Sequence, residues 1–310
     1  MRDALPKSWR NVLAALAQQR HSDANALAEH VYLRHFTRFV PGESATDRAS
    51  GDPAFVERAA LALQHARGWE PGWEVIQRAD DWSFVHSGRM QLFVHAESES
   101  HPPRARVGKR VAVRMPCLRE GLVPHFLYAF SRAGAIDPGA PHVRIYLNVD
   151  AERGLALIQA LLLSKPFERL RFETKIPNDP AAFNRCDTML VYADANDARA
   201  ILDRLRVLRR KQPRGWRKPT PFAALQLEPG IALAESPPLK DEQARSFGQH
   251  RSALVAKAIV DGIRAGERTP ELWAARLVAN LQREGIDPTQ PHGQRLPARI
   301  WKSLTGRSDL

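Results

Sequence analysis

The fold is decided between residues 142 and 193, where the chain reads HVRIYLNVD (142–150) and, after a helical run at 151–164, RFETKIPNDPAAFNRCDTMLVYA (171–193). The segments HVRIYL, RFETKI and DTMLVYA have the composition of strands. A further helix extends to residue 211. The order strand, helix, strand, strand, helix predicts an α+β unit in which a helix packs on one face of a sheet.

Cationic and phenolic side chains collect on these predicted strands. Arg144 and Tyr146 are two residues apart, so alternation places them on the same face of the sheet. Lys175 lies in the second strand, Tyr192 lies near the end of the third, and Arg185 lies in the connection between them. Three cations and two phenols on one side of a sheet indicate a site for an anion.

The N-terminal part of the chain has helical patterns. A helix over 8–20 and a second helix from Asp23 carry apolar residues at helical spacing. Asp52 followed by Pro53 is an N-cap pattern, and it precedes a third helix that extends to residue 66. We therefore expect an N-terminal helical subdomain at residues 1–68.

From Trp69 the period changes to alternation, and runs within residues 73–96 predict an antiparallel meander. We predict a flexible connector at 97–108 and helical structure around 126–132. The second domain then comprises residues 69–310. The expected fold class is α+β, with an antiparallel-rich mixed sheet and packed helices, preceded by the small helical layer.

A long helix is predicted at 247–265, and its first turn contains Gln249, His250 and Arg251. Cationic side chains and backbone amides at the start of a helix favour an anion there. Arg251 is therefore a third candidate for anion binding, and Arg245 is a weaker one. Alternatively, Arg251 only supports the geometry of the helix start.

The chain has a formal net charge of +12, which favours acidic partners such as nucleic acid, an anionic membrane face or an acidic or phosphorylated peptide. A basic run at 204–218 surrounds Trp216 and can bind nucleic acid. Ile201, Leu205 and Leu208 share its helix, so a solvated outer face explains the same residues. We expect a peptide partner in preference to nucleic acid.

Cys117 and Cys186 are the only cysteines, which favours a reducing compartment. The N-terminus lacks the pattern of a secretory signal, and no stretch approaches a membrane span of about 20 apolar residues. These features predict a soluble cytoplasmic protein with no membrane partner.

Several motifs of enzyme chemistry are missing from the sequence. It has no Walker loop, no GxGxxG after a strand, no nucleophile elbow and no zinc-like spacing of His and Cys. We expect no metal and no cofactor. Catalysis would then use Lys, Arg, Tyr and His side chains, with a lysine base whose pKa is lowered by burial or neighbouring arginines. Arginines would hold a phosphate in bidentate geometry.

Several motifs follow one another in a family-like order: VRIYLN, FETKIPN, NRCDTMLVYA, PFAALQLEPGIALAESP and SFGQHR, with GWEPGWEV at 68–75. In this order they resemble the HopA family of type III secreted effectors, from about residue 25 to residue 290. The same family includes the lyase component of class V lanthipeptide biosynthesis. It is distantly similar to phosphothreonine lyases, and the resemblance implies a metal-free phosphoserine/phosphothreonine lyase.

The resemblance also implies roles for individual residues. Those lyases have a cation on one strand and a general acid two residues later, followed along the chain by a lysine base, an arginine and a tyrosine. The residues that match this order here are Arg144, Tyr146, Lys175, Arg185 and Tyr192. Phosphothreonine lyases have histidine as the acid, whereas this chain has Tyr146 there. Tyr192 and His250 are the alternatives for that role. The implied partners are a phosphorylated precursor peptide, a Ser/Thr kinase and a cyclase.

Two other functions remain open from the sequence. A non-catalytic effector or scaffold can bind a phosphorylated or acidic peptide through the same arginines. Nucleic-acid binding through 204–218 is the third hypothesis. Lys175 also has a plain interpretation as a strand lysine that faces solvent, and Arg185 can form a local ion pair with Asp187 that fixes the turn.

Overall fold

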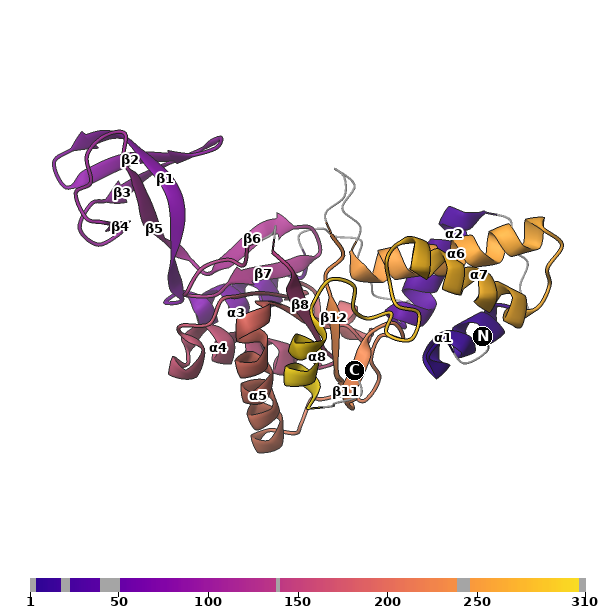
Figure 1. Ribbon diagram of the computed structural model, residues 1–310. Coiled ribbons are helices and arrows are strands. Elements are labelled where there is room, and N and C mark those ends of the chain that lie inside the picture. The colour runs from indigo at the N-terminus through magenta and orange to yellow at the C-terminus, as the bar shows by residue number, and fades with distance from the viewer. Residues whose placement is uncertain (1–3, 18–22, 40–50, 138–139, 239–245, 307–310) are drawn as a thin grey trace. The chain divides into compact units, whose positions relative to one another are not determined.

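The computed structural model describes residues 4–17, 23–39, 51–137, 140–238 and 246–306 (Figure 1). The chain divides into two compact units. The first comprises Met1–Asp47, Asp137–Gly154 and Pro180–Leu310, and the second comprises Arg48–Ile136 and Leu155–Asp179. The predicted boundary between residues 68 and 69 stays a prediction.

A group of helices forms one part of the first unit (Figure 1). They are α1 (Lys7–Leu16), α2 (Ala24–His30), the π-helical turn η1 (Val31–Phe36), α6 (Phe247–Arg264) and α7 (Pro270–Arg283). Asp23 caps α2, and Ser246 and Gln249 form a capping box at α6, so unpaired amide groups at both helix starts find acceptors. The predicted helices in these segments are confirmed.

The strands of the first unit lie in the order β11-β12-β8-β10, and each neighbouring pair is antiparallel. Their bounds are β8 (His142–Leu147), β10 (Met189–Asp194), β11 (Leu225–Glu228) and β12 (Ile231–Glu235). Helix α5 (Ala195–Lys211) packs on β8 and β10, and α8 (Ala298–Thr305) packs on α5. Tyr146 and Leu190 project to the other face, where they join the core formed with the helical group.

The second unit contains the predicted meander. Its five-stranded sheet has the order β3-β2-β1-β5-β4, with β1 (Arg67–Ala79), β2 (Trp82–Ser87), β3 (Met90–His95), β4 (Ser100–His101) and β5 (Arg110–Pro116). Trp73, Val75, Val85 and neighbouring valines form its core. The segment 97–108, which was predicted to be a flexible connector, contains the short strand β4. Helix α3 (Pro53–Leu63) begins at the predicted Asp52 cap.

The prediction of helical structure around residues 126–132 is wrong. The structure has strands β6 (Leu118–Val123) and β7 (Phe126–Phe130), and β7 pairs with both β6 and β9 (Phe172–Pro177). Leu127 and Ala129 are buried, whereas Phe126, Tyr128 and Phe130 are half-buried, which is the alternation of a strand. Helix α4 (Ala151–Leu163) and the 3-10 turns η2 (Lys165–Phe167) and η3 (Pro180–Phe183) complete the described elements.

The predicted α+β class with antiparallel strands and N-terminal helices is confirmed. Within the described ranges, no helix is both long enough and apolar enough to cross a membrane.

Candidate functional site

The site begins on strands β8 and β10 of the first unit. Tyr192 lies opposite Arg144, and Leu190 lies opposite Tyr146, so these four side chains share a face of the sheet. The predicted pairing of Arg144 and Tyr146 on one face is thus confirmed, with Tyr192 beside them. This is also the face that the helical group covers.

Tyr146 is buried in the core of the first unit, with 2% of its surface exposed. The rings of Phe36 and Phe247 lie 5.9 and 6.3 Å from its own ring, centre to centre. Burial raises the pKa of the Tyr146 phenol, and the charge of Arg144 and its hydrogen bond to the phenol offset only part of this effect. Tyr146 is therefore a neutral phenol that can donate a hydrogen bond.

Arg144 is half-buried and contacts Ser236, just after β12, and Tyr192 on β10. Its Nε donates to Oγ of Ser236 at 2.7 Å, and its guanidinium carbon lies 5.0 Å from the centre of the Tyr192 ring. A guanidinium at this distance is attracted to the face of an aromatic ring. The two contacts hold the arginine over the sheet beside both tyrosines.

Arg185 forms the ion pair with Asp187 that the sequence predicts. Nε donates to Oδ1 at 2.5 Å and Nη2 donates to Oδ2 at 2.9 Å, while Nη2 also lies 3.4 Å from the phenol oxygen of Tyr32. The two side chains are 16% and 10% exposed. Burial opposes the charged form of Arg185, but the contacts with Asp187 outweigh it and raise the pKa of Arg185.

Tyr32 is a contributor that the sequence patterns do not indicate. It lies in the π-helical turn η1, whose extra residue per turn changes which side chains face the sheet. Burial, followed by the charge of Asp187, raises the pKa of its phenol, although Arg185 opposes this. The sequence patterns do not indicate Ser236 either, because it follows the end of β12 and is 92 residues away from Arg144 in the chain.

The Arg185 segment is fastened to η1 through the backbone. The amide of Cys186 donates to the carbonyl of Thr37 at 2.7 Å, and its Sγ donates to the carbonyl of Phe36 at 3.1 Å. Burial raises the pKa of the Cys186 thiol, so it is a protonated donor rather than a nucleophile. Together with the Tyr32 contact, these bonds fix where the Arg185 guanidinium lies.

Arg251 is fully buried, with 0% of its surface exposed. Its Nε donates to the carbonyl of Pro291 at 2.9 Å, and its Nη1 donates to Nδ1 of His250 at 2.8 Å. Burial lowers the pKa of Arg251 to about 10, although Glu235 opposes the shift. Among the described residues its Nη2 has no hydrogen-bond partner. Its predicted role as a phosphate ligand stays a prediction, and Arg245 lies outside the described residues.

Lys175 belongs to the second unit, where it lies on β9 opposite Tyr128. It is half-buried, and its Nζ lies 4.3 Å from the centre of the Phe126 ring. Within the ranges that the structure describes, the ammonium makes no ion pair, whereas Glu173 on the same strand accepts a hydrogen bond from Tyr128. Its predicted approach to the arginines of the first unit stays a prediction.

Part of the basic run at 204–218 is used within the fold. Arg206 and Arg209 both contact the carboxylate of Glu228, at 2.6 and 3.2 Å, and Arg209 also lies over Trp216. Arg217 donates to the carbonyl of Phe183. These contacts explain several of the cations without a ligand, and the nucleic-acid hypothesis stays untested. In the described part of the chain, no three His, Cys, Asp or Glu side chains group as a metal site would require.

Comparison with known proteins places this geometry in a family. The model of the HopA1 effector protein family matches residues 117–292, more than half of the 310-residue chain. The structure of the effector protein from Pseudomonas syringae pv. tomato strain DC3000 is 15% identical with a TM-score of 0.56, and the match covers 95% of this chain and 99% of that one. The effector protein from Pseudomonas syringae pv. syringae strain 61 is 14% identical with a TM-score of 0.51, covering 92% and 95%. No curated protein matches the sequence significantly.

Proposed function

We propose that this chain, which belongs to the HopA1 effector protein family, binds a phosphorylated peptide and removes the phosphate of phosphoserine or phosphothreonine by β-elimination. The product is a dehydroamino acid. The substrate must come from a kinase reaction, and a dehydroamino acid is an electrophile that a cyclase can couple to a thiol.

The observation that carries this proposal is the cluster formed by Arg144, Arg185, Tyr192 and Tyr32 around one face of β8 and β10. Asp187 pairs with Arg185 and orients it, and Arg144 lies beside the hydroxyl group of Ser236 and the ring of Tyr192. Arginines in fixed geometry bind phosphate oxygens, and half-buried positions strengthen that attraction. The cluster therefore suits one phosphate monoester.

In the proposed reaction a base takes the α-proton of the phosphorylated residue. The electron pair of the Cα–H bond forms the Cα=Cβ double bond, the Cβ–O bond breaks, and the phosphate leaves with that electron pair. The arginines stabilise the negative charge that grows on the leaving phosphate. Phosphate is a tolerable leaving group when clamped by cations, so a strong general acid is not required.

We assign the base to Lys175, whose side-chain nitrogen makes no ion pair among the described residues and lies against Phe126. In this role the neutral amine takes the α-proton and becomes an ammonium group. The mechanism requires Lys175 to reach the same peptide as the arginines, and the activity of its variants tests this requirement.

Tyr192 is the better candidate for assisting the leaving oxygen. It is half-buried beside Arg144, whereas Tyr146 lies in the core and burial raises its pKa. His250 uses Nδ1 as an acceptor from Arg251, which leaves only Nε2 for another partner.

Incubation of the intact protein with a phosphothreonine peptide, followed by mass spectrometry, tests the proposal. Loss of one phosphoric acid from the peptide is expected. Release of phosphate with return of threonine would show hydrolysis and contradict elimination.

A second candidate function is binding without catalysis. The burial of Tyr146 and Arg251 favours it, because both side chains then serve the core and only Arg144 and Arg185 remain for an anion. A phosphopeptide that binds and is recovered unchanged, equally by wild type and by Lys175→Ala, would establish this function instead.

A further inference from the structure

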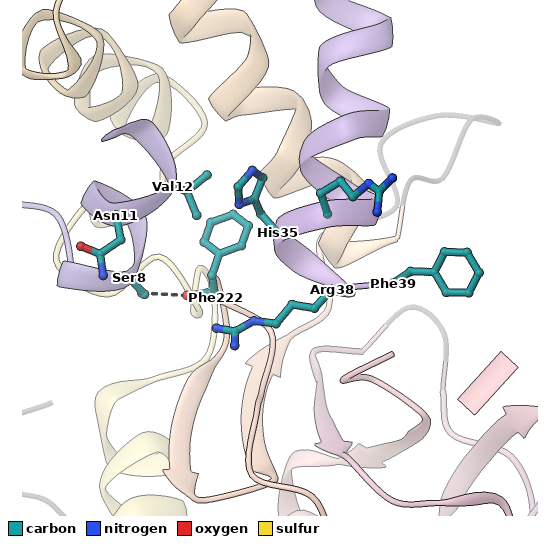
Figure 2. Close-up of a pocket in the computed structure, with 8 residues that line it drawn as sticks. Ser8, Asn11, Val12, His35, Arg38, Phe39 and Phe222 are labelled. Carbon is teal, nitrogen blue, oxygen red and sulfur yellow. Dashed lines mark hydrogen bonds between the residues drawn. The ribbon is translucent and has the colours of Figure 1, made fainter. Parts of the chain in front are cut away.

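Two cavities lie between α1, the end of η1 and the segment 218–226, within the first unit. Their volumes are about 460 and 570 Å³, within the range of ligand pockets, and Ser8, Arg38 and Phe222 line both. Figure 2 shows the smaller one, with Phe222 between α1 on one side and His35 and Arg38 on the other. The two cavities share these lining residues, and together they are called the groove below.

The polar lining of this groove is cationic. Arg34 and Arg38 line the smaller cavity, and Arg38 and Lys218 line the larger one. No Asp or Glu is among the described residues that line either cavity. Over the same described ranges, none of these three cations makes an ion pair, in contrast to Arg185 and Arg206 of the same unit.

A buried histidine with an unpartnered ring nitrogen is among the residues that line the larger cavity. His292 is 5% exposed, and its Nε2 has no hydrogen-bond partner among the described residues. Its ring packs edge-on against Trp301, with 4.7 Å between ring centres. A buried donor or acceptor without a partner is unfavourable, so a hydrogen bond from a ligand group to Nε2 would stabilise the complex.

The backbone presents Arg38 in an unusual conformation. Its φ is +53°, a left-handed value that is unfavourable for a residue with a Cβ and persists only when neighbours enforce it. Thr37 enforces it here, since its Oγ1 donates to the carbonyl of Leu33 at 2.8 Å and accepts from the amide of Phe39 at 3.1 Å. Arg38 consequently extends beneath Phe222 toward Ser8 (Figure 2).

The floor of the groove is apolar. Phe222 is 6% exposed and packs edge-on against Trp9 at 5.1 Å, and Val12 lies beside it. Ser8 holds the floor in place by donating to the carbonyl of Phe222 at 2.9 Å. A ligand for this groove needs an apolar part for the floor and carboxylates for the surrounding cations.

We propose that this groove binds an acidic segment of a peptide, with Asp or Glu residues next to a large apolar side chain. The inference rests on the proposed function, because it names the part of the peptide substrate that docks away from the reacting phosphorylated residue. The groove and the arginine cluster share η1: Arg34, His35 and Arg38 extend from its end, and Tyr32 contacts Arg185. A docked segment therefore also holds the turn that positions Arg185.

The test uses the intact protein and a short fluorescein-labelled peptide that contains Glu, Asp and Leu but no phosphate. Fluorescence anisotropy should show binding that Arg38→Glu and Lys218→Glu each weaken about tenfold or more, whereas Arg264→Glu, an exposed arginine outside the groove, leaves it unchanged. Replacing Glu and Asp by Gln and Asn, or Leu by Ser, should abolish binding. The unfolding midpoint of each variant checks that it is folded.

Failure of this inference and failure of the lyase proposal look different. Equal binding by wild type and both groove variants would overturn the docking site, as would tighter binding of single-stranded DNA that depends on Arg38 and Lys218. Elimination of phosphate from peptides with and without the acidic segment, at equal rates, would overturn it too and leave the lyase standing. Binding of the acidic peptide at the groove without elimination from a phosphopeptide would support the docking site and overturn the lyase proposal.

Discussion

Arg185 and Asp187 are joined by two parallel hydrogen bonds, Nε to Oδ1 at 2.5 Å and Nη2 to Oδ2 at 2.9 Å, in a site where both side chains are nearly buried. The pair lies two residues apart in one connection, and that connection is bonded to η1 through Cys186. Asp187 consequently fixes the direction of the Arg185 guanidinium and compensates its charge.

Replacement of Asp187 by Asn should destabilise the protein, because Arg185 keeps its charge in a poorly solvated place without a counter-ion. Removing one partner of such a pair costs about 3 kcal/mol. Urea denaturation of the variant measures this. Asp203→Asn breaks ion pairs whose carboxylate is 47% exposed and should cost less than about 1 kcal/mol. An equal loss of unfolding free energy in the two variants would show that burial does not strengthen the Arg185–Asp187 pair.

Arg144 should be the main contributor to phosphate binding. Arg144→Gln keeps a hydrogen-bond donor near Ser236 but removes the charge, and we expect a phosphopeptide to bind about tenfold to a hundredfold more weakly. Arg144→Lys should recover only part of this, since lysine cannot form the two-point contact. Calorimetric titration with a phosphorylated and an unphosphorylated peptide measures both effects. An identical loss for the two peptides would mean that Arg144 does not contact phosphate.

The fold was predictable where local chemistry decides the element. Asp52-Pro53 starts α3, Ser246 and Gln249 start α6, and the central strands and helices occur in the predicted order. The prediction of helical structure at 126–132 was wrong. The run FLYAF is too short to distinguish the helical repeat from the alternation of a strand, and the pairing of β7 with β9 makes it a strand. The resemblance to the HopA effectors is confirmed by the family match.

The site was predictable only in part. Arg144, Tyr146 and Tyr192 share a face because alternation and neighbouring strands dictate it, and the Arg185–Asp187 pair is local in sequence. The sequence does not show that Tyr146 lies under η1 and α6, because that depends on how distant helices pack. Nor does it indicate Ser236, which meets Arg144 only through the pairing of β12 with β8.

Lys175 should be essential for elimination and dispensable for binding. Lys175→Ala removes the proposed base, and we expect the rate to fall by a factor of about a hundred to ten thousand. Phosphopeptide affinity should stay within about twofold of wild type, because the arginines supply the binding energy. Mass spectrometry of the product and calorimetry of the complex give the two readings. Lys109→Ala, an exposed lysine of the same unit, is the matched control. Full activity of Lys175→Ala would remove Lys175 from the mechanism.

Tyr192 and Tyr146, which share a face of β8 and β10, should differ in their effect on rate. Tyr192→Phe removes a half-buried phenol next to Arg144, and we expect elimination to slow about a hundredfold if this phenol assists the leaving oxygen. Tyr146→Phe removes a phenol in the core whose pKa is raised by burial, so its main effect should be on stability. Rates at saturating peptide, together with unfolding midpoints, separate the two outcomes. The opposite order of rates would identify Tyr146 as the acid.

His292 should make the stability of the protein depend on pH. Burial, followed by the charge of Arg251, lowers its pKa from 6.5 to about 4, so the unfolded chain binds a proton there more readily than the folded one. The stability that the neutral ring supports is complete above pH 6.5 and is lost as the pH falls toward about 4. The loss amounts to about 3 kcal/mol for this one group.

His292→Phe keeps an aromatic ring against Trp301 but cannot be protonated. Urea denaturation at pH values between 4 and 7 should therefore give a shallower fall in unfolding free energy for this variant than for wild type. His142 and His35, whose pKa values are also lowered by burial, titrate in both proteins and cancel in the difference. Parallel curves for wild type and variant would mean that His292 is solvated enough to accept a proton in the folded state.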